Sequence, residues 1–368
     1  MSADLGPPEP VQVLDDAEQE RAAEPDIIPQ YSVLSYGADF DVAGLVSRMD
    51  NADIEIPAFQ RGFVWDFRRA ARFVESLLLG LPVPGIFLWR NPQTQRLVVI
   101  DGQQRLRTLQ GFYHGTILNR VFSIPRKLSP YQLVAPRFVG KTYRKLDAED
   151  KRLLDNSIIH ATIVNQERPP DDYSSVFYLF ERLNTEGLPL QPQEIRTAVY
   201  QGEFVSFLEQ LNQFASWRAV YGKSSPRMKD RELILRFFAM FFRLDDYSRP
   251  MKEFLNRFLL NNKSLDRYPA ATLQDAFCPT IDLVAHQLGK SAFRTGPALN
   301  AAIFDAVMVG LAKRVQLRPL AQPTAIAKAY SNLLSLDDFR NATSKATADE
   351  KSVSSRVKLA IDAFAHLP

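Results

Sequence analysis

The stretch from Val98 to Gly115 reads VVIDGQQRLRTLQGFYHG, and it predicts a strand that runs directly into a helix. Residues 98–100 are β-branched and typical of a buried strand, while Leu106, Leu109 and Tyr113 recur at helical spacing. The polar residues DGQQR, 101–105, are therefore expected to lie on a strand-to-helix turn. Such a turn directs backbone N–H groups and the positive end of the helix dipole outward, which favours an anion.

Strand and helix patterns alternate through the first half of the chain. Strand patterns fall at residues 30–37, 84–91, 96–100 and 160–166. Helix patterns run through Leu45 and Met49 and over residues 67–79. This alternation predicts an α/β domain over residues 30–170.

From residue 171 onward the pattern becomes helical. Examples are residues 174–184, 191–202, 230–244 and 298–314. We therefore expect an all-helical domain over residues 171–368. The predicted fold class of the chain is α+β, with an α/β domain followed by a helical one.

The net charge of +3 is unevenly distributed along the chain. Residues 1–29 hold eight acidic residues and one arginine, which gives −7, so residues 30–368 carry +10. The acidic arm contains prolines and lacks periodicity, and we expect it to be disordered. The basic remainder is compatible with a polyanionic partner and also with an ordinary solvated surface.

Several classes of protein have no support in the composition. The start of the sequence lacks the features of a secretory signal, and the apolar run from Leu77 is interrupted by Pro82 and Pro84. We therefore expect a cytoplasmic protein without a membrane partner. The single cysteine, Cys278, excludes an internal disulfide and is expected to be an inert core residue. The four histidines lack metal-ligand spacing, and no serine stands in a nucleophile elbow.

Each residue of DGQQR has a chemical use at a phosphate site. Asp101 could bind Mg²⁺ through water or activate that water, and Gly102 lets the backbone approach a ligand. Gln103 and Gln104 could hold a ribose, a base or an attacking water, and Arg105 can bind two phosphate oxygens. In the structural alternative, Asp101 caps the helix, Gly102 turns the chain and Arg105 is a surface charge. The spacing alone does not choose between the two interpretations.

A second polar group lies in IPAFQRGFVW, where Gln60 and Arg61 stand among bulky apolar neighbours that include Trp65. The structural interpretation is a loop held to the core by its aromatic residues, and the residues alone favour that interpretation. The functional alternative is that the two polar side chains line a site.

A third group lies in FERLNTEGLPLQPQEIRTAV, where Asn184 and Gly187 predict a turn. Glu194 and Arg196 follow on a helix. Because they are two residues apart, they do not face each other on that helix and are available to pair elsewhere.

Taken together, these stretches resemble the N-terminal domain family of GmrSD-type restriction proteins, a branch of the ParB/sulfiredoxin-like superfamily. The motifs are IPAFQR..VW, VIDGQQRLRTL and FERLNTEG.PL...EIR, in that order from Ile56 to Arg196. The segment RMKDRELILRFFA, from Arg227, also resembles members that carry this domain. The resemblance implies a ParB/sulfiredoxin-like fold for residues 30–170. It also implies nucleotide-dependent recognition or restriction of modified or foreign DNA in a prokaryotic restriction or anti-phage defence system.

The resemblance further implies a nucleotide-phosphate site at DGQQR. The catalytic candidates are Asp101, Gln103, Gln104 and Arg105. The candidates for cofactor binding are Gln60, Arg61, Gly102, Arg105 and Thr108. The other motif residues are Trp65, Asn184, Gly187, Glu194 and Arg196. The implied cofactor is a nucleoside triphosphate (NTP), with GTP, ATP and CTP all open, together with Mg²⁺, for which Asp101 is the candidate ligand.

One departure from the family bears on function. Many relatives append an HNH nuclease domain, but the last hundred residues here contain only His286 and His366. We therefore expect no standard nuclease centre in this chain and consider a partner nuclease.

The leading hypothesis is an NTP-hydrolysing, DNA-directed protein. The alternatives are a non-hydrolysing nucleotide switch or adaptor and a nucleic-acid-processing enzyme that cleaves strands or removes bases, and a homo-oligomer remains open.

Two basic segments offer places for DNA contact. Residues 120–152 contain nine Lys or Arg against three acidic residues, interleaved with Tyr131, Phe138 and Tyr143, and residues 218–243 contain seven against two. Basic side chains can neutralise phosphates, and aromatic rings can stack on exposed bases. The alternative is that both segments are solvated surface.

Overall fold

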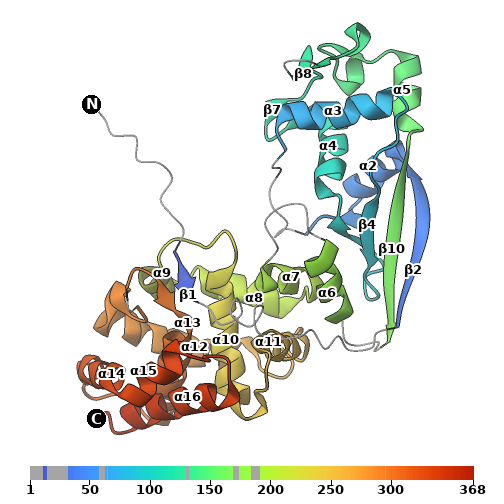
Figure 1. Ribbon diagram of the computed structural model, residues 1–368. Helices are drawn as coiled ribbons and strands as arrows, with labels where there is room; N and C mark the ends of the chain where they lie inside the picture. The colour runs from blue at the N-terminus through green and yellow to red at the C-terminus, as the bar shows by residue number, and fades with distance from the viewer. Residues whose placement is uncertain are drawn as a thin grey trace, which may run out of the picture. The chain divides into compact units, whose positions relative to one another are not determined.

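The computed structural model of this chain describes residues 11–14, 32–57, 63, 65–129, 132–168, 174–183, 191–294 and 296–368. The chain divides into two compact units. Residues 29–190 form one, and residues 1–28 together with 191–368 form the other. The first unit is mixed α/β and the second is mostly helical (Figure 1), which confirms the predicted fold class.

The α/β unit is built on a five-stranded mixed sheet in the order β2-β10-β4-β5-β3. Its strands are β2 (Ser32–Asp41), β3 (Ile54–Glu55), β4 (Ile86–Arg90), β5 (Leu97–Asp101) and β10 (Ile158–Arg168). Strand β10 pairs antiparallel with β2 and parallel with β4, while β5 is antiparallel to β4 and parallel to β3. The four predicted strands are confirmed, and the two-residue β3 was not predicted.

Helices cover both faces of this sheet. One face carries α2 (Val42–Asp50), α3 (Phe67–Leu78), α4 (Gln103–His114) and α5 (Ala148–Asp155). Their apolar sides share one core with Leu88 of β4 and Val99 of β5. The alternate residues Trp89 and Val98 are buried on the opposite face, where α6 (Ser174–Leu183) contacts β5.

Aspartate caps define where two of these helices begin. The Asp41 carboxylate accepts from the backbone N–H of Gly44 at 2.6 Å, and the Asp66 carboxylate accepts from that of Arg69 at 2.7 Å. Each cap satisfies an N–H group that has no partner within its helix. The starts of α2 and α3 are therefore encoded locally.

Short elements connect α4 to α5. They are β6 (Thr116–Ile117), β7 (Arg120–Val121), β8 (Lys127–Ser129), β9 (Gln132–Leu133), η1 (Pro136–Phe138) and η2 (Tyr143–Lys145). Strands β6 and β7 form one antiparallel pair, and β8 and β9 form another. The first of the two basic segments lies largely on these elements.

The second unit is an assembly of helices. They are α7 (Pro192–Val199), α8 (Glu203–Asn212), α9 (Ala215–Tyr221), α10 (Lys229–Arg243), η3 (Leu244–Asp246), α11 (Met251–Leu260), α12 (Ala270–Gln287), η4 (Gly289–Ser291), α13 (Ala301–Leu317), α14 (Ala325–Ser335), α15 (Asp337–Ser344) and α16 (Glu350–Ala365). Helix α13 is buried along most of its length and packs against α10, α12 and α16. Within the described ranges, no helix combines the length and the hydropathy needed to cross a bilayer.

Part of the acidic arm is placed on the helical unit. Strand β1 (Val13–Leu14) pairs in parallel with β11 (Leu299–Asn300), and the Gln12 carbonyl accepts from the backbone N–H of Leu299 at 2.9 Å. This short pairing was not expected, because the arm has no periodic pattern. Residues 11–14 therefore differ from the disorder predicted for residues 1–29.

Candidate functional site

The DGQQR stretch stands where the sequence predicts, with Asp101 ending β5 and Gln103 beginning α4. Between them, Gly102 adopts φ 101° and ψ 6°, a left-handed conformation that favours glycine. Gly102 is also closely packed, because a Cβ atom there would lie 2.9 Å from the Cβ of Ile86. Both the backbone conformation and the available space therefore require glycine at this turn.

Asp101 and Arg105 form an ion pair across the first turn of α4. The Arg105 Nη2 donates to the Asp101 Oδ2 at 2.6 Å, and the two side chains are 12% and 32% exposed. Helix α4 begins without a side-chain cap, so the capping role considered for Asp101 is corrected. The turn thus presents an acid and a guanidinium side by side at a helix N-terminus, where the dipole is positive.

Gln104 joins this turn to the first motif. Its Oε1 accepts from the backbone N–H of Trp65 at 3.3 Å. The Trp65 ring lies against Phe73, and the Arg69 guanidinium carbon lies 4.8 Å from the ring centre. The structure therefore brings Trp65 of the first motif to the DGQQR turn.

Thr108 is the one described cofactor-binding candidate that the structure does not bring to the site. Its side chain is fully buried, and its hydroxyl donates to the Gln104 carbonyl at 2.6 Å. A threonine in mid-helix commonly satisfies its hydroxyl in this way. The correction is that Thr108 contributes to the interior of α4 and offers no accessible surface to a ligand.

Arg107 was missed by the sequence analysis, although it lies one helical turn from Gln103 on the same side of α4. The Gln103 Oε1 and the Arg107 Nε are buried, and neither has a hydrogen-bond partner among the described residues. Burial lowers the pKa of Arg107. Since buried polar atoms are normally paired, these two atoms mark a place where a polar ligand would add hydrogen bonds. In the sequence, the four-residue spacing of Gln103 and Arg107 was the feature that could have predicted their position on one side of the helix.

Four motif residues cannot be placed. Gln60 and Arg61 of the first motif lie outside the described residues, and so do Asn184 and Gly187 of the third. Their predicted roles remain predictions.

The last part of the third motif lies in the helical unit. Glu194 accepts from Arg227 at 3.0 Å, and Arg196 donates to Glu232 at 3.0 Å and to the Asn256 side chain at 2.8 Å. Glu194 and Arg196 are at most 2% exposed. As their spacing predicts, the two do not pair with each other. Their contacts connect α7 to α10 and α11, which gives both residues a stabilising role in that unit.

The second basic segment, residues 218–243, is largely neutralised inside the helical unit. Six of its seven basic residues contact carboxylates, namely Arg218 with Asp230, Arg227 with Glu194, Lys229 with Glu232, Arg231 with Glu209, Arg236 with Asp305 and Arg243 with Asp246. Arg236 is fully buried, so it cannot reach DNA. Phosphate contact by this segment is therefore restricted to Lys223, which is exposed, and to its half-buried members.

The first basic segment has most of its charges at the surface, whereas its described aromatic residues Phe138 and Tyr143 are buried and half-buried. Seven of the nine basic residues in 120–152 are exposed. Phe138 is fully buried, so it is not available to stack on bases. Tyr143 stacks on Tyr113 with ring centres 3.9 Å apart and donates to Asp155 at 3.0 Å. Burial and the Asp155 carboxylate raise the pKa of both tyrosines, and Tyr131 lies outside the described residues.

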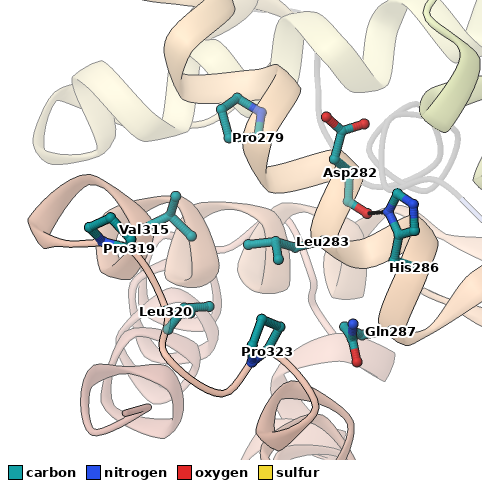
Figure 2. Close-up of a pocket in the computed structure, with 9 residues that line it drawn as sticks. All are labelled: Pro279, Asp282, Leu283, His286, Gln287, Val315, Pro319, Leu320 and Pro323. Atoms are coloured by element: carbon teal, nitrogen blue, oxygen red, sulfur yellow. Dashed lines mark hydrogen bonds between the residues drawn. The ribbon is translucent and has the colours of Figure 1, made fainter.

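A separate apolar pocket of about 440 Å³ lies in the helical unit, beside α12, the end of α13 and the segment that follows (Figure 2). Proline and aliphatic side chains form most of its wall, with Asp282, His286 and Gln287 at one side. The Nδ1 of His286 lies 2.7 Å from the Asp282 carbonyl oxygen, within α12. In the described part of the chain, no group of three His, Cys, Asp or Glu side chains is arranged to hold a metal ion.

Residues 42–201 match the family described as GmrSD restriction endonuclease, N-terminal domain. The matched range contains the DGQQR turn and both flanking motifs. Residues 42–201 are therefore similar to the N-terminal domain of this family, as the three motifs predict, and this domain suggests a protein of a restriction or defence system. No curated protein matches the sequence.

Proposed function

We propose that the DGQQR turn binds the phosphates of a nucleoside triphosphate and hydrolyses it in a DNA-directed restriction or anti-phage defence protein. The observation that carries this proposal is the Asp101–Arg105 ion pair, held at 2.6 Å beside the left-handed Gly102 at the start of α4. An acid, a guanidinium and a helix N-terminus at one turn are the groups that a Mg²⁺-triphosphate requires.

The residues divide the chemistry between them. Arg105 would exchange its contact with Asp101 for phosphate oxygens, and Asp101 would then be available for the Mg²⁺ that accompanies the triphosphate. Bound Mg²⁺ would supply charge neutralisation at the phosphates. The buried Gln103 Oε1 and Arg107 Nε lie on the other side of α4 from Arg105, because residues two apart do not face each other on a helix, so the proposed phosphate site rests on Asp101, Gly102 and Arg105.

The first test is phosphate release from each of the four ribonucleoside triphosphates with Mg²⁺, with and without DNA. We expect release by the wild type and its loss in Asp101→Ala. Asp39→Ala is the matched control, because Asp39 is an exposed aspartate of the same unit that pairs with His160 on β10. Release by Asp101→Ala at the wild-type rate would remove the site assignment.

Binding of nucleotide without release would favour the second candidate, a nucleotide-controlled switch that recruits a partner nuclease. The Arg105 guanidinium can bind phosphate oxygens whether or not the triphosphate is hydrolysed, so the same turn supports a binding role without turnover. Arg105→Ala is expected to abolish nucleotide binding while the fold remains intact, because the Asp101 carboxylate that loses its partner is 32% exposed and can be hydrated.

A further inference from the structure

The helical unit contains a second pocket, of about 410 Å³, between the end of α10, α11 and the loop that precedes α12. Its volume is within the usual range for small-ligand sites. Arg243, Arg257 and Arg267 line it, with Asp246 as its one carboxylate. The pocket is therefore positively charged, and it shares no residue with the DGQQR turn.

The arginines are arranged so that they can receive an anion. Arg257 and Arg267 are exposed, and Arg257 donates to the Ser248 hydroxyl at 3.0 Å. Arg243 contacts Asp246, which accounts for one of the three positive charges. Guanidinium groups bind phosphate oxygens in a planar, two-pronged geometry, so a phosphate group suits this wall.

A buried amide provides an independent indication of a ligand. Asn262 lines the same pocket and is only 2% exposed. Its Nδ2 donates to the Phe258 carbonyl at 2.7 Å, whereas its Oδ1 is buried and has no hydrogen-bond partner among the described residues. A buried acceptor without a partner is energetically costly, and a ligand that donates an N–H would satisfy it.

Aromatic rings fix the remaining wall. The Tyr268 ring is stacked on Phe242 with 4.3 Å between centres and lies nearly parallel to Phe258 at 5.9 Å. The Arg267 guanidinium carbon lies 5.8 Å from the centre of the Tyr268 ring. This packing holds the aromatic side of the pocket in a fixed position.

From these features we propose that this pocket binds a nucleotide, whose phosphate contacts Arg257 and Arg267 and whose base donates an N–H to the Asn262 Oδ1. The nucleotide could be free or one unit of a DNA strand, since the recognised chemistry is the same. The strand form rests on the DNA-directed function proposed above, whereas the free form does not.

The test measures binding by the full-length chain of AMP, ribose 5-phosphate, inorganic phosphate and a single-stranded DNA oligomer of mixed sequence. The Arg257→Ala/Arg267→Ala variant is compared with Arg318→Ala/Arg340→Ala, which removes two exposed arginines elsewhere on the same unit. Both are also made in the Arg105→Ala chain, so that binding at the DGQQR turn does not contribute. Circular dichroism verifies the fold of each variant.

We expect Arg257→Ala/Arg267→Ala to weaken binding of AMP or the oligomer by at least about tenfold, the loss expected for charge-assisted hydrogen bonds to phosphate. The control variant should change binding by less than about twofold. Tighter binding of the oligomer than of AMP identifies a strand unit as the ligand, and the reverse identifies a free nucleotide. The proposal would be overturned if Arg257→Ala/Arg267→Ala bound these ligands as tightly as the wild type. It would also be overturned if Arg318→Ala/Arg340→Ala lost as much affinity as Arg257→Ala/Arg267→Ala.

Asn262→Leu tests the base contact separately. The wild type should prefer AMP to ribose 5-phosphate, and Asn262→Leu should reduce this preference by roughly tenfold. Binding of inorganic phosphate as tight as that of AMP would mean a simple anion site and would contradict a nucleotide. Phosphate release from NTP by Arg257→Ala/Arg267→Ala should stay at the wild-type level, so failure here is distinguishable from failure of the DGQQR proposal.

Discussion

Arg236 of α10 and Asp305 of α13 form an ion pair in the interior of the helical unit, with 2.5 Å between Nη2 and Oδ2 and at most 1% of either side chain exposed. Arg356 of α16 also contacts this carboxylate, with its Nη2 at 3.4 Å from Oδ2. One buried acid therefore compensates two buried guanidinium groups and connects three helices.

Replacing this acid should be severely destabilising. We expect Asp305→Ala to lower the free energy of unfolding by about 3–5 kcal/mol, because it removes the carboxylate that both buried guanidinium groups contact. Urea denaturation measures the change. Asp337→Ala is the control, since that aspartate is 85% exposed and its pair with Arg340 should contribute no more than about 1 kcal/mol. Similar losses in the two variants would contradict this account.

Gly102 is required both by its left-handed backbone and by its close packing against Ile86. Gly115, at the other end of α4, has only the left-handed backbone, so comparing the two glycines separates the two effects. Gly102→Ala should lower the free energy of unfolding by about 2–4 kcal/mol, because it combines a left-handed backbone with a close approach to Ile86. Gly115, which ends α4 at φ 79°, has no atom within 4 Å of an added Cβ. Gly115→Ala should therefore cost only about 1–2 kcal/mol. Equal costs would show that packing against Ile86 contributes nothing.

Arg196 should act through stability, because its contacts are all inside the helical unit. We expect Arg196→Met to lower the free energy of unfolding by about 3 kcal/mol, since it leaves the buried Glu232 with fewer partners. Arg196→Lys should not restore the loss, because an ammonium cannot reproduce the contacts to Glu232 and Asn256 together. Lys223→Ala, at an exposed position, is the control. Full stability of Arg196→Met in a thermal melt would refute the structural role.

Cys278 should be a slow nucleophile near neutral pH. Burial, with the nearby carboxylates of Asp282 and Asp275, raises the pKa of its thiol to about 11. The thiolate is the reactive form, so at pH 8 alkylation of the folded chain should be roughly a hundredfold slower than that of the denatured chain, whose thiol has an ordinary pKa near 8.5. The folded rate should keep rising with pH beyond about 9. A plateau near pH 9 would show that the thiol is not shifted.

The acidic arm is expected to oppose DNA binding through its charge. Deleting residues 1–29 removes −7 from the chain, so binding to duplex DNA should tighten at low salt and change little at high salt, where charges are screened. A matched variant that neutralises Asp15, Asp16, Glu18 and Glu20 keeps the β1–β11 pairing and isolates the charge effect. Fluorescence anisotropy across a salt series measures both. Unchanged affinity in both variants at low salt would exclude electrostatic competition by the arm.

Local patterns predicted the main elements well because each is stabilised within a few residues. The β-branched run before DGQQR became β5, and the helical spacing of Leu106 and Leu109 became the buried side of α4. The two-residue β3 and the pairing of β1 were not predictable, because each depends on a partner strand distant in the sequence. For the same reason the sequence did not indicate that Phe138 would be buried.

The sequence by itself determined the family of the N-terminal domain, the α/β then helical organisation and the position of the DGQQR turn, because these depend on periodicity and on motifs of adjacent residues. Only the tertiary structure decided which polar groups face each other. It paired Asp101 with Arg105, buried the hydroxyl of Thr108, left the Arg107 Nε buried without a hydrogen-bond partner among the described residues and placed the buried Glu194 and Arg196 in separate ion pairs. Such contacts depend on distances between side chains and on burial, which arise only when separate segments pack together.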